Sequence, residues 1–151
     1  MTSDTGMLLT GGTQLINQLF YFLDQSNYEE LVALFEPDGI WHRQGEVLSG
    51  SAQIMQAMKK RPATQRIRHV VTNGFIESQS EGLVHFVAYM MAYRFDDGSV
   101  RTGPVEISRP LRMSVIRAAL RQTQGAWKVA EMSLTSEFEF VSNATTAGIQ
   151  R

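Results

Sequence analysis

The first part of the chain has its apolar residues at the spacing of a helix surface. Apolar positions three and four residues apart predict an amphipathic helix over 13–24. Its stripe consists of Leu15, Ile16, Leu19, Phe20 and Leu23. The same spacing predicts a second helix over 28–35, where Asn27 and Glu30 are arranged as a capping box, and a third helix capped by Ser51. We therefore expect three helices in the N-terminal part of the chain.

Farther along the chain the apolar residues alternate with polar ones. Four long segments alternate in this way, with turn residues between them: 67–77, 83–95, 111–123 and 126–141. A short hairpin, 40–43 with 46–48, precedes the third helix. Helices followed by strands predict an α+β domain, with the helices on one face of an antiparallel sheet. The connection 96–110 is longer than a hairpin needs, so we expect a lid or an arm that contacts a partner.

The two ends of the chain have neither pattern. We expect residues 1–12 and 142–151 to be flexible and 13–141 to form a single domain. The N-terminus lacks the basic and apolar regions of a signal peptide, and no apolar run is long enough for a membrane span. The sequence therefore predicts a cytoplasmic protein that does not bind membranes.

Composition removes several classes of function. With 14 basic and 15 acidic residues, the net charge is -1, which argues against a nucleic-acid binder. The absence of cysteine excludes thiolate metal sites, iron–sulfur clusters and cysteine nucleophiles. The three histidines lack the spacing of metal ligands, and no phosphate-binding glycine motif or nucleophile elbow occurs. We therefore expect neither a cofactor nor a metal.

One predicted strand suggests an assembly. In 83–95, both the face with Tyr89 and Tyr93 and the face with Phe86 and Met90 are mostly apolar. A sheet with one face in water should alternate more cleanly. We therefore expect a homodimer in which a second subunit covers the outer face of the sheet.

Two ionisable residues are the main candidates for chemistry. Asp24 continues the apolar stripe of the first helix, so its carboxylate points toward the core. His69 alternates with Ile67, Val71 and Asn73, so two polar groups share an otherwise apolar face, as in small-molecule pockets. If Asp24 reaches His69, the carboxylate would orient an acid–base imidazole. Asp24 could instead bond amides of the turn, and His69 a backbone carbonyl.

Other residues are candidates for the wall of a substrate pocket. They are Tyr21, Trp41, Val71, Asn73, Phe86, Met90 and Glu131. Glu131 alternates in phase with Trp127 and Val129, whose bulk suggests that this side of the strand faces inward. The alternative is that Glu131 is a solvated residue near the edge of the sheet. Tyr21 and Trp41 could equally fill the core. We expect the ligand to be a small hydrophobic molecule.

A basic stretch surrounds the end of the third predicted helix. It consists of Lys59, Lys60, Arg61, Arg66 and Arg68. A solvated helix end explains it, and a phosphate-bearing ligand such as an acyl-thioester carrier is the alternative. Nucleic acid fits less well, because no aromatic residues are interleaved with the charges.

The order of helices, hairpin and strands can be followed in four stretches: FLDQSNYEELVALFEPDGIW, EVLSGSAQIMQAM, RIRHVVTNGFIE and GAWKVAEM. Over roughly residues 10–140, this order resembles the SnoaL-like proteins of the nuclear transport factor 2-like superfamily. The resemblance implies a cone-shaped α+β fold, in which a curved antiparallel sheet wraps about three N-terminal helices around an apolar cavity. It also implies dimers formed through the sheet.

The resemblance implies a site as well. Catalytic members include dehydratases, aldol cyclases, epoxide hydrolases and ketosteroid isomerases. In dehydratases of the scytalone and bile-acid types, a carboxylate at the end of the first helix pairs with a histidine on the first long strand. Asp24 and His69 stand at those two positions. The sequence departs from the scytalone type at Leu23, where that type has a tyrosine, and at Ala92, where it has a second histidine.

Two hypotheses of different classes follow. The first is a cofactor-independent lyase or isomerase acting on a small cyclic or polyketide-like molecule, with His69 as acid–base group, Asp24 as its partner and Asn73 bonding the substrate oxygen. The second is a non-catalytic binding or assembly module, similar to the small subunits of ring-hydroxylating dioxygenases. Ketosteroid isomerisation is disfavoured, because Arg43 and Leu19 occupy the positions of that enzyme's base and oxyanion tyrosine.

Overall fold

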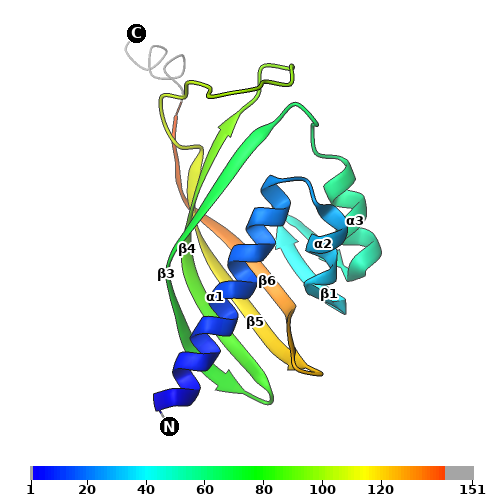
Figure 1. Cartoon of the computed structure of the whole chain (residues 1–151), viewed down its shortest axis with the longest axis vertical. Helices are drawn as coiled ribbons and strands as arrows, with labels where there is room; N and C mark the ends of the chain where they lie inside the picture. The colour runs from blue at the N-terminus through cyan, green and yellow to red at the C-terminus, as the bar shows by residue number, and fades with distance from the viewer. Residues whose placement is uncertain (1, 142–151) are drawn as a thin grey trace.

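Within residues 2–141, which the computed structural model describes, one six-stranded sheet carries three helices on one of its faces (Figure 1). The strand order is β2-β1-β6-β5-β4-β3. The helices are α1 (Thr2–Asp24), α2 (Tyr28–Ala33) and α3 (Gly50–Lys59). The strands are β1 (Phe35–Arg43), β2 (Glu46–Ser49), β3 (Arg66–Ser80), β4 (Leu83–Phe95), β5 (Arg112–Thr123) and β6 (Ala126–Glu139). The predicted α+β class is confirmed.

The sheet is mixed, and this corrects the expected antiparallel arrangement. β1 pairs with β6 in parallel, whereas the other neighbouring strands are antiparallel. β1 begins at Phe35, earlier than the expected hairpin, because the Val129 amide donates to the Leu34 carbonyl at 2.8 Å and draws the chain onto β6. The sheet curves around the helices but stays open, since β2 and β3 form its two unjoined edges.

The N-terminal segment also differs from the prediction. α1 begins at Thr2, so most of the segment 1–12 is helical rather than flexible. The glycines of this segment have low helix propensity, so the sequence did not predict a helix here. Close packing explains one of them, because a Cβ on Gly12 would lie 3.2 Å from the Phe86 ring. The expected flexible tail, 142–151, lies outside the described residues.

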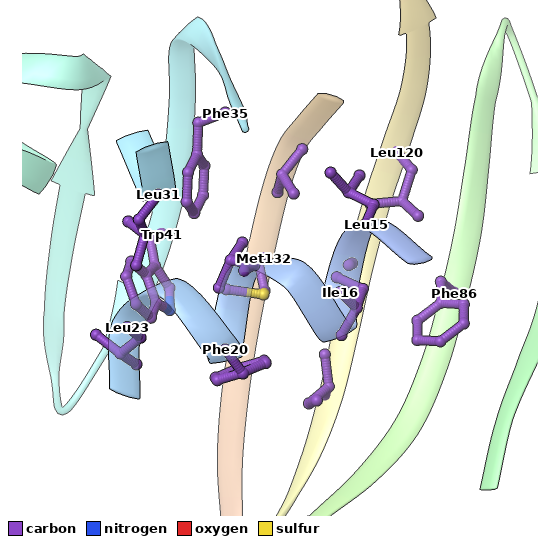
Figure 2. Close-up of a cluster of buried hydrophobic side chains, with 14 of the residues drawn as sticks. Leu15, Ile16, Phe20, Leu23, Leu31, Phe35, Trp41, Phe86, Leu120 and Met132 are labelled. Atoms are coloured by element: carbon purple, nitrogen blue, oxygen red, sulfur yellow. The ribbon is translucent and has the colours of Figure 1, made fainter. Parts of the chain in front are cut away.

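The core lies between α1 and the inner face of the sheet (Figure 2). The predicted stripe of α1 is buried throughout, with each member at most 3% exposed. It packs against side chains from several strands, among them Trp41, Phe86, Leu120 and Met132. Burying a side chain of this size contributes about 1.5–3 kcal/mol. This packing fixes the C-terminal end of α1 against β3, where the candidate residues lie.

The two faces of β4 have different surroundings. Val84, Phe86, Ala88, Met90 and Ala92 are buried beneath the helices. On the outer face of the sheet, large apolar side chains stay exposed, including Val70, Phe75, Tyr89 and Phe138. No helix within residues 2–141 is long and apolar enough to cross a membrane.

Candidate functional site

Asp24 and His69 form a buried pair. The Nδ1 atom of His69 lies 2.6 Å from Oδ1 of Asp24, and the backbone N–H of His69 donates to Oδ2 at 2.9 Å. The two side chains are only 8% and 6% exposed. Because the carboxylate accepts both bonds, the ring is held in one orientation with a proton on Nδ1, and in the neutral form of the ring Nε2 carries the lone pair. We call this pair the dyad.

Local structure explains why the dyad forms. Asp24 is the last residue of α1, where a carboxylate meets the negative end of the helix dipole, so bonds from His69 offset an unfavourable position. Arg61 donates to the Leu23 carbonyl at 2.8 Å, and Arg68 to the Asp24 carbonyl at 3.4 Å. These two arginines thus donate to carbonyls of the last turn of α1. On the other side, the Phe20 ring packs 5.1 Å from the imidazole, centroid to centroid.

The dyad histidine opens onto a cavity of about 490 Å³, which we call the central cavity. Apolar side chains form much of its wall, including Phe20, Leu23, Trp41, Met90 and Leu134. A volume of this size suits a small organic ligand. The predicted wall residues Trp41 and Met90 are therefore at the site, although both are also part of the core.

Two other predicted residues lie on a different side of the dyad. Tyr21 and Val71 line a separate cleft of about 320 Å³, together with Asp24 and His69. His69 thus separates this cleft from the central cavity. Phe86 lines neither space, because its ring packs over Gly74, where a Cβ would lie 2.8 Å from the Phe86 Cζ atom.

Asn73 is not at the site, which corrects its predicted role. It lies on the outer face and lines an outer groove with Phe75 and Tyr89. The cause is a bulge in β3 between Thr72 and Phe75, where Asn73 adopts a φ of 59°. A bulge adds a residue and reverses the alternation beyond it. The periodicity that linked Asn73 to His69 therefore ends before it reaches Asn73.

Glu131 is likewise misplaced by a bulge. In β6 the register shifts between Val129, which pairs with Leu120, and Glu131, which pairs with Ala119. Val129 stays buried, whereas Glu131 lies exposed on the outer face with its Oε1 atom 2.7 Å from Nε2 of His42. The prediction that Glu131 faces the pocket is therefore wrong.

Sequence reasoning missed the arginines of the central cavity. Arg43 and Arg112 line it, as does Arg61, which the sequence placed in a solvated basic stretch. Arg61 also donates to the Tyr28 hydroxyl at 3.2 Å. Strand parity offered a signal for Arg43, because it alternates with the fully buried Trp41 on β1. In residues 2–141, no group of three His, Asp or Glu side chains converges as metal ligands do.

Comparison with known proteins identifies the family. Residues 13–133 match the SnoaL-like domain, and the chain belongs to this family. No curated protein is significantly similar in sequence. The resemblance to the SnoaL-like proteins is thereby confirmed, and the solved structures below share the fold.

Solved structures share the fold at low identity. A proposed scytalone dehydratase from Novosphingobium aromaticivorans has a TM-score of 0.76 at 17% identity, with 95% of this chain and 94% of that chain covered. ActVI-ORFA from Streptomyces coelicolor has a TM-score of 0.73 at 14% identity, covering 86% and 97%. A protein of unknown function with a cystatin-like fold from Nostoc punctiforme has a TM-score of 0.68 at 15% identity, covering 85% and 90%.

Proposed function

We propose that the protein is a cofactor-independent lyase or isomerase of the dehydratase or cyclase type, acting on a small cyclic or polyketide-like molecule. The observation that carries the proposal is the buried dyad, whose imidazole opens onto a cavity with both apolar and polar walls. Membership of the SnoaL-like family and the fold shared with a proposed scytalone dehydratase support the same class.

The dyad supplies an acid–base group that needs no cofactor. Within residues 2–141, Nε2 of His69 makes no hydrogen bond, so its lone pair is free to accept a proton. Asp24 holds the ring and stabilises the positive charge that the imidazole acquires. A positioned acid–base group of this kind typically accelerates a reaction about 10²–10⁴-fold.

In the dehydration direction, Nε2 removes the proton next to a carbonyl, and the electron pair of that C–H bond moves toward the carbonyl. The carbon–carbon double bond then forms as the C–O bond of a β-hydroxyl group breaks. The imidazolium returns its proton to the leaving oxygen, which departs as water. Asn73 lies on the outer face, so it does not bond the substrate oxygen as the sequence suggested.

The experiment is a screen of cyclic β-hydroxy ketones, followed by ultraviolet detection of the conjugated product. His69→Gln should lower turnover at least about 100-fold. His42→Gln is the matched control, because His42 also pairs with a carboxylate at 2.7 Å but lies on the exposed outer face. Equal turnover by His69→Gln and wild type on a substrate found in this way would refute the role.

The alternative is a binding or assembly module without catalysis. It predicts that Asp24→Asn and His69→Gln leave ligand affinity nearly unchanged and that no substrate is turned over. The fold shared with a proposed aromatic ring hydroxylase from Novosphingobium aromaticivorans, at 14% identity, is compatible with both alternatives. Recovery of a large partner subunit with the protein from its native host would favour the module.

A further inference from the structure

The central cavity is strongly cationic. Its wall holds four arginines and one carboxylate, Arg43, Arg61, Arg94, Arg112 and Glu139. The whole chain has a net charge of only -1, so this concentration of positive charge is local. Guanidinium groups that are partly removed from water favour anionic partners, because their desolvation is costly.

Arg43 lacks such a partner. It is half-buried on β1, and within residues 2–141 its guanidinium makes no hydrogen bond and no ion pair. Its Cζ atom lies 5.7 Å from the centre of the Trp41 ring, which supplies only a cation–π contact. Burial, followed by the positive charge of Arg61, lowers the pKa of Arg43 from its ordinary value.

Other residues of the cavity wall also have hydrogen-bond donors without an acceptor. The buried Nε atoms of Arg61 and Arg112 and the indole Nε1 of Trp41 have no hydrogen-bond partner in the described chain. Arg112 has a carboxylate near it, but its Nε atom is 3.7 Å from Oε2 of Glu139, beyond hydrogen-bond distance. Glu139 itself is 61% exposed, so it screens this cation weakly. Such unpartnered donors are rare, and they add to the positive potential at the cavity wall without contacting a ligand themselves.

We infer that the substrate of the central cavity is an organic acid, whose carboxylate binds among Arg43, Arg61 and Arg112. This inference rests on the proposed function insofar as the bound acid is a substrate, but the binding of an acid by the arginines does not depend on catalysis. A carboxylate fits the planar fork of a guanidinium group and accepts several charge-assisted bonds. The ring system would then lie against Phe20 and Met90, with its reacting carbon toward His69.

The test measures binding by calorimetry with two probes of equal shape, 2-naphthoate and the neutral 2-naphthamide. Wild-type protein should bind the carboxylate at least about tenfold more tightly than the amide. Arg43→Gln and Arg112→Gln should each remove most of that preference. Arg117→Gln is the matched control, because Arg117 lies on the outer face with its side chain 59% exposed, and it should keep the preference.

A measurement on the unmodified protein guards against variants that fold poorly. Raising the salt concentration from about 0.05 to about 0.5 M should weaken naphthoate binding and leave naphthamide binding unchanged. Equal affinity for the two probes, or binding of neither, overturns the inference. Binding of inorganic phosphate without binding of naphthoate also overturns it, because the arginines would then serve a phosphate group.

The inference and the proposed function can fail separately. His69→Gln should still bind naphthoate with a preference over naphthamide, because His69 is not part of the arginine cluster formed by Arg43, Arg61 and Arg112. If that preference is present but His69→Gln keeps full turnover on a substrate, the acid–base role fails and the anion site stands. If turnover depends on His69 but the probes bind equally, the anion site fails and the catalytic proposal stands.

Discussion

Replacement of Asp24 by asparagine tests the dyad most directly, because the change is nearly isosteric. The carboxylate accepts two hydrogen bonds, from the backbone N–H of His69 at 2.9 Å and from its Nδ1 at 2.6 Å. Asparagine has only one carbonyl oxygen, so its NH₂ group must face one of these two positions. If it faces the ring, Nδ1 must lose its proton, and the proton then sits on Nε2, which can no longer act as a base. If it faces the backbone, a buried N–H of β3 is left unpaired.

The expected loss of stability follows from this geometry. A hydrogen bond to a charged group contributes about 1.5–3 kcal/mol, and an unpaired buried donor costs about 1–3 kcal/mol. Removing the negative charge from the C-terminal end of α1 raises the free energy of unfolding by about 0.3–1 kcal/mol, because that charge opposes the helix dipole. We therefore expect Asp24→Asn to lower the free energy of unfolding by about 1–3 kcal/mol and turnover by about 10²–10⁴-fold.

Urea unfolding followed by circular dichroism measures the first quantity, and long-range ¹⁵N–¹H spectra of the imidazole report which ring nitrogen carries the proton. Asp38→Asn is the matched control, because it removes the same charge from an exposed position and should change the free energy of unfolding by less than about 0.5 kcal/mol. An Asp24→Asn protein with wild-type stability and an unchanged ring tautomer would refute the reasoning.

Three further predictions concern the rest of the fold. Gly74→Ala should lower the free energy of unfolding by about 1–3 kcal/mol, measured in urea, because its Cβ would lie 2.8 Å from the Phe86 ring. The hydrogen bond from Arg101 lowers the pKa of Asp97 from 3.8 to about 2. The ionised carboxylate therefore stabilises the 97–101 loop fully above pH 3.8, and this stabilisation is lost as the pH falls through about 2. Amide exchange in this loop should therefore rise across that range, and unchanged exchange contradicts the prediction. We also propose that a second copy covers the outer face of the sheet; Tyr89→Glu should then shift sedimentation from dimer to monomer, whereas a monomeric wild-type protein would exclude the dimer.

The spacing of apolar residues predicted the helices and strands and the inward direction of Asp24 and His69. The helical stripe that ends at Asp24 and the alternation that surrounds His69 both extend over short stretches of regular backbone. Within such stretches, the direction of a side chain follows from its position in the sequence. The class of fold and the inward direction of Asp24 and His69 were therefore accessible before the tertiary structure was known, whereas their pairing was implied only by the family resemblance.

The remaining predictions failed where the backbone is irregular or where distant segments meet. Bulges beside Asn73 and before Glu131 reversed the alternation of two strands, and the alternation was extended across both. The parallel pairing of β1 with β6 likewise depends on a contact between segments far apart in the chain. Spacing along the chain carries no information about such contacts.

The arginine cluster shows the same limit most clearly. Arg43, Arg61 and Arg112 come from β1, the segment after α3, and β5, and along the sequence only the strand parity of Arg43 indicates that one of them faces inward. Only the curvature of the sheet around α1 brings them to one cavity with His69. Composition and periodicity thus determined the kind of fold and the inward direction of Asp24 and His69, whereas the charge that faces a ligand depends on which strands the folded chain places side by side.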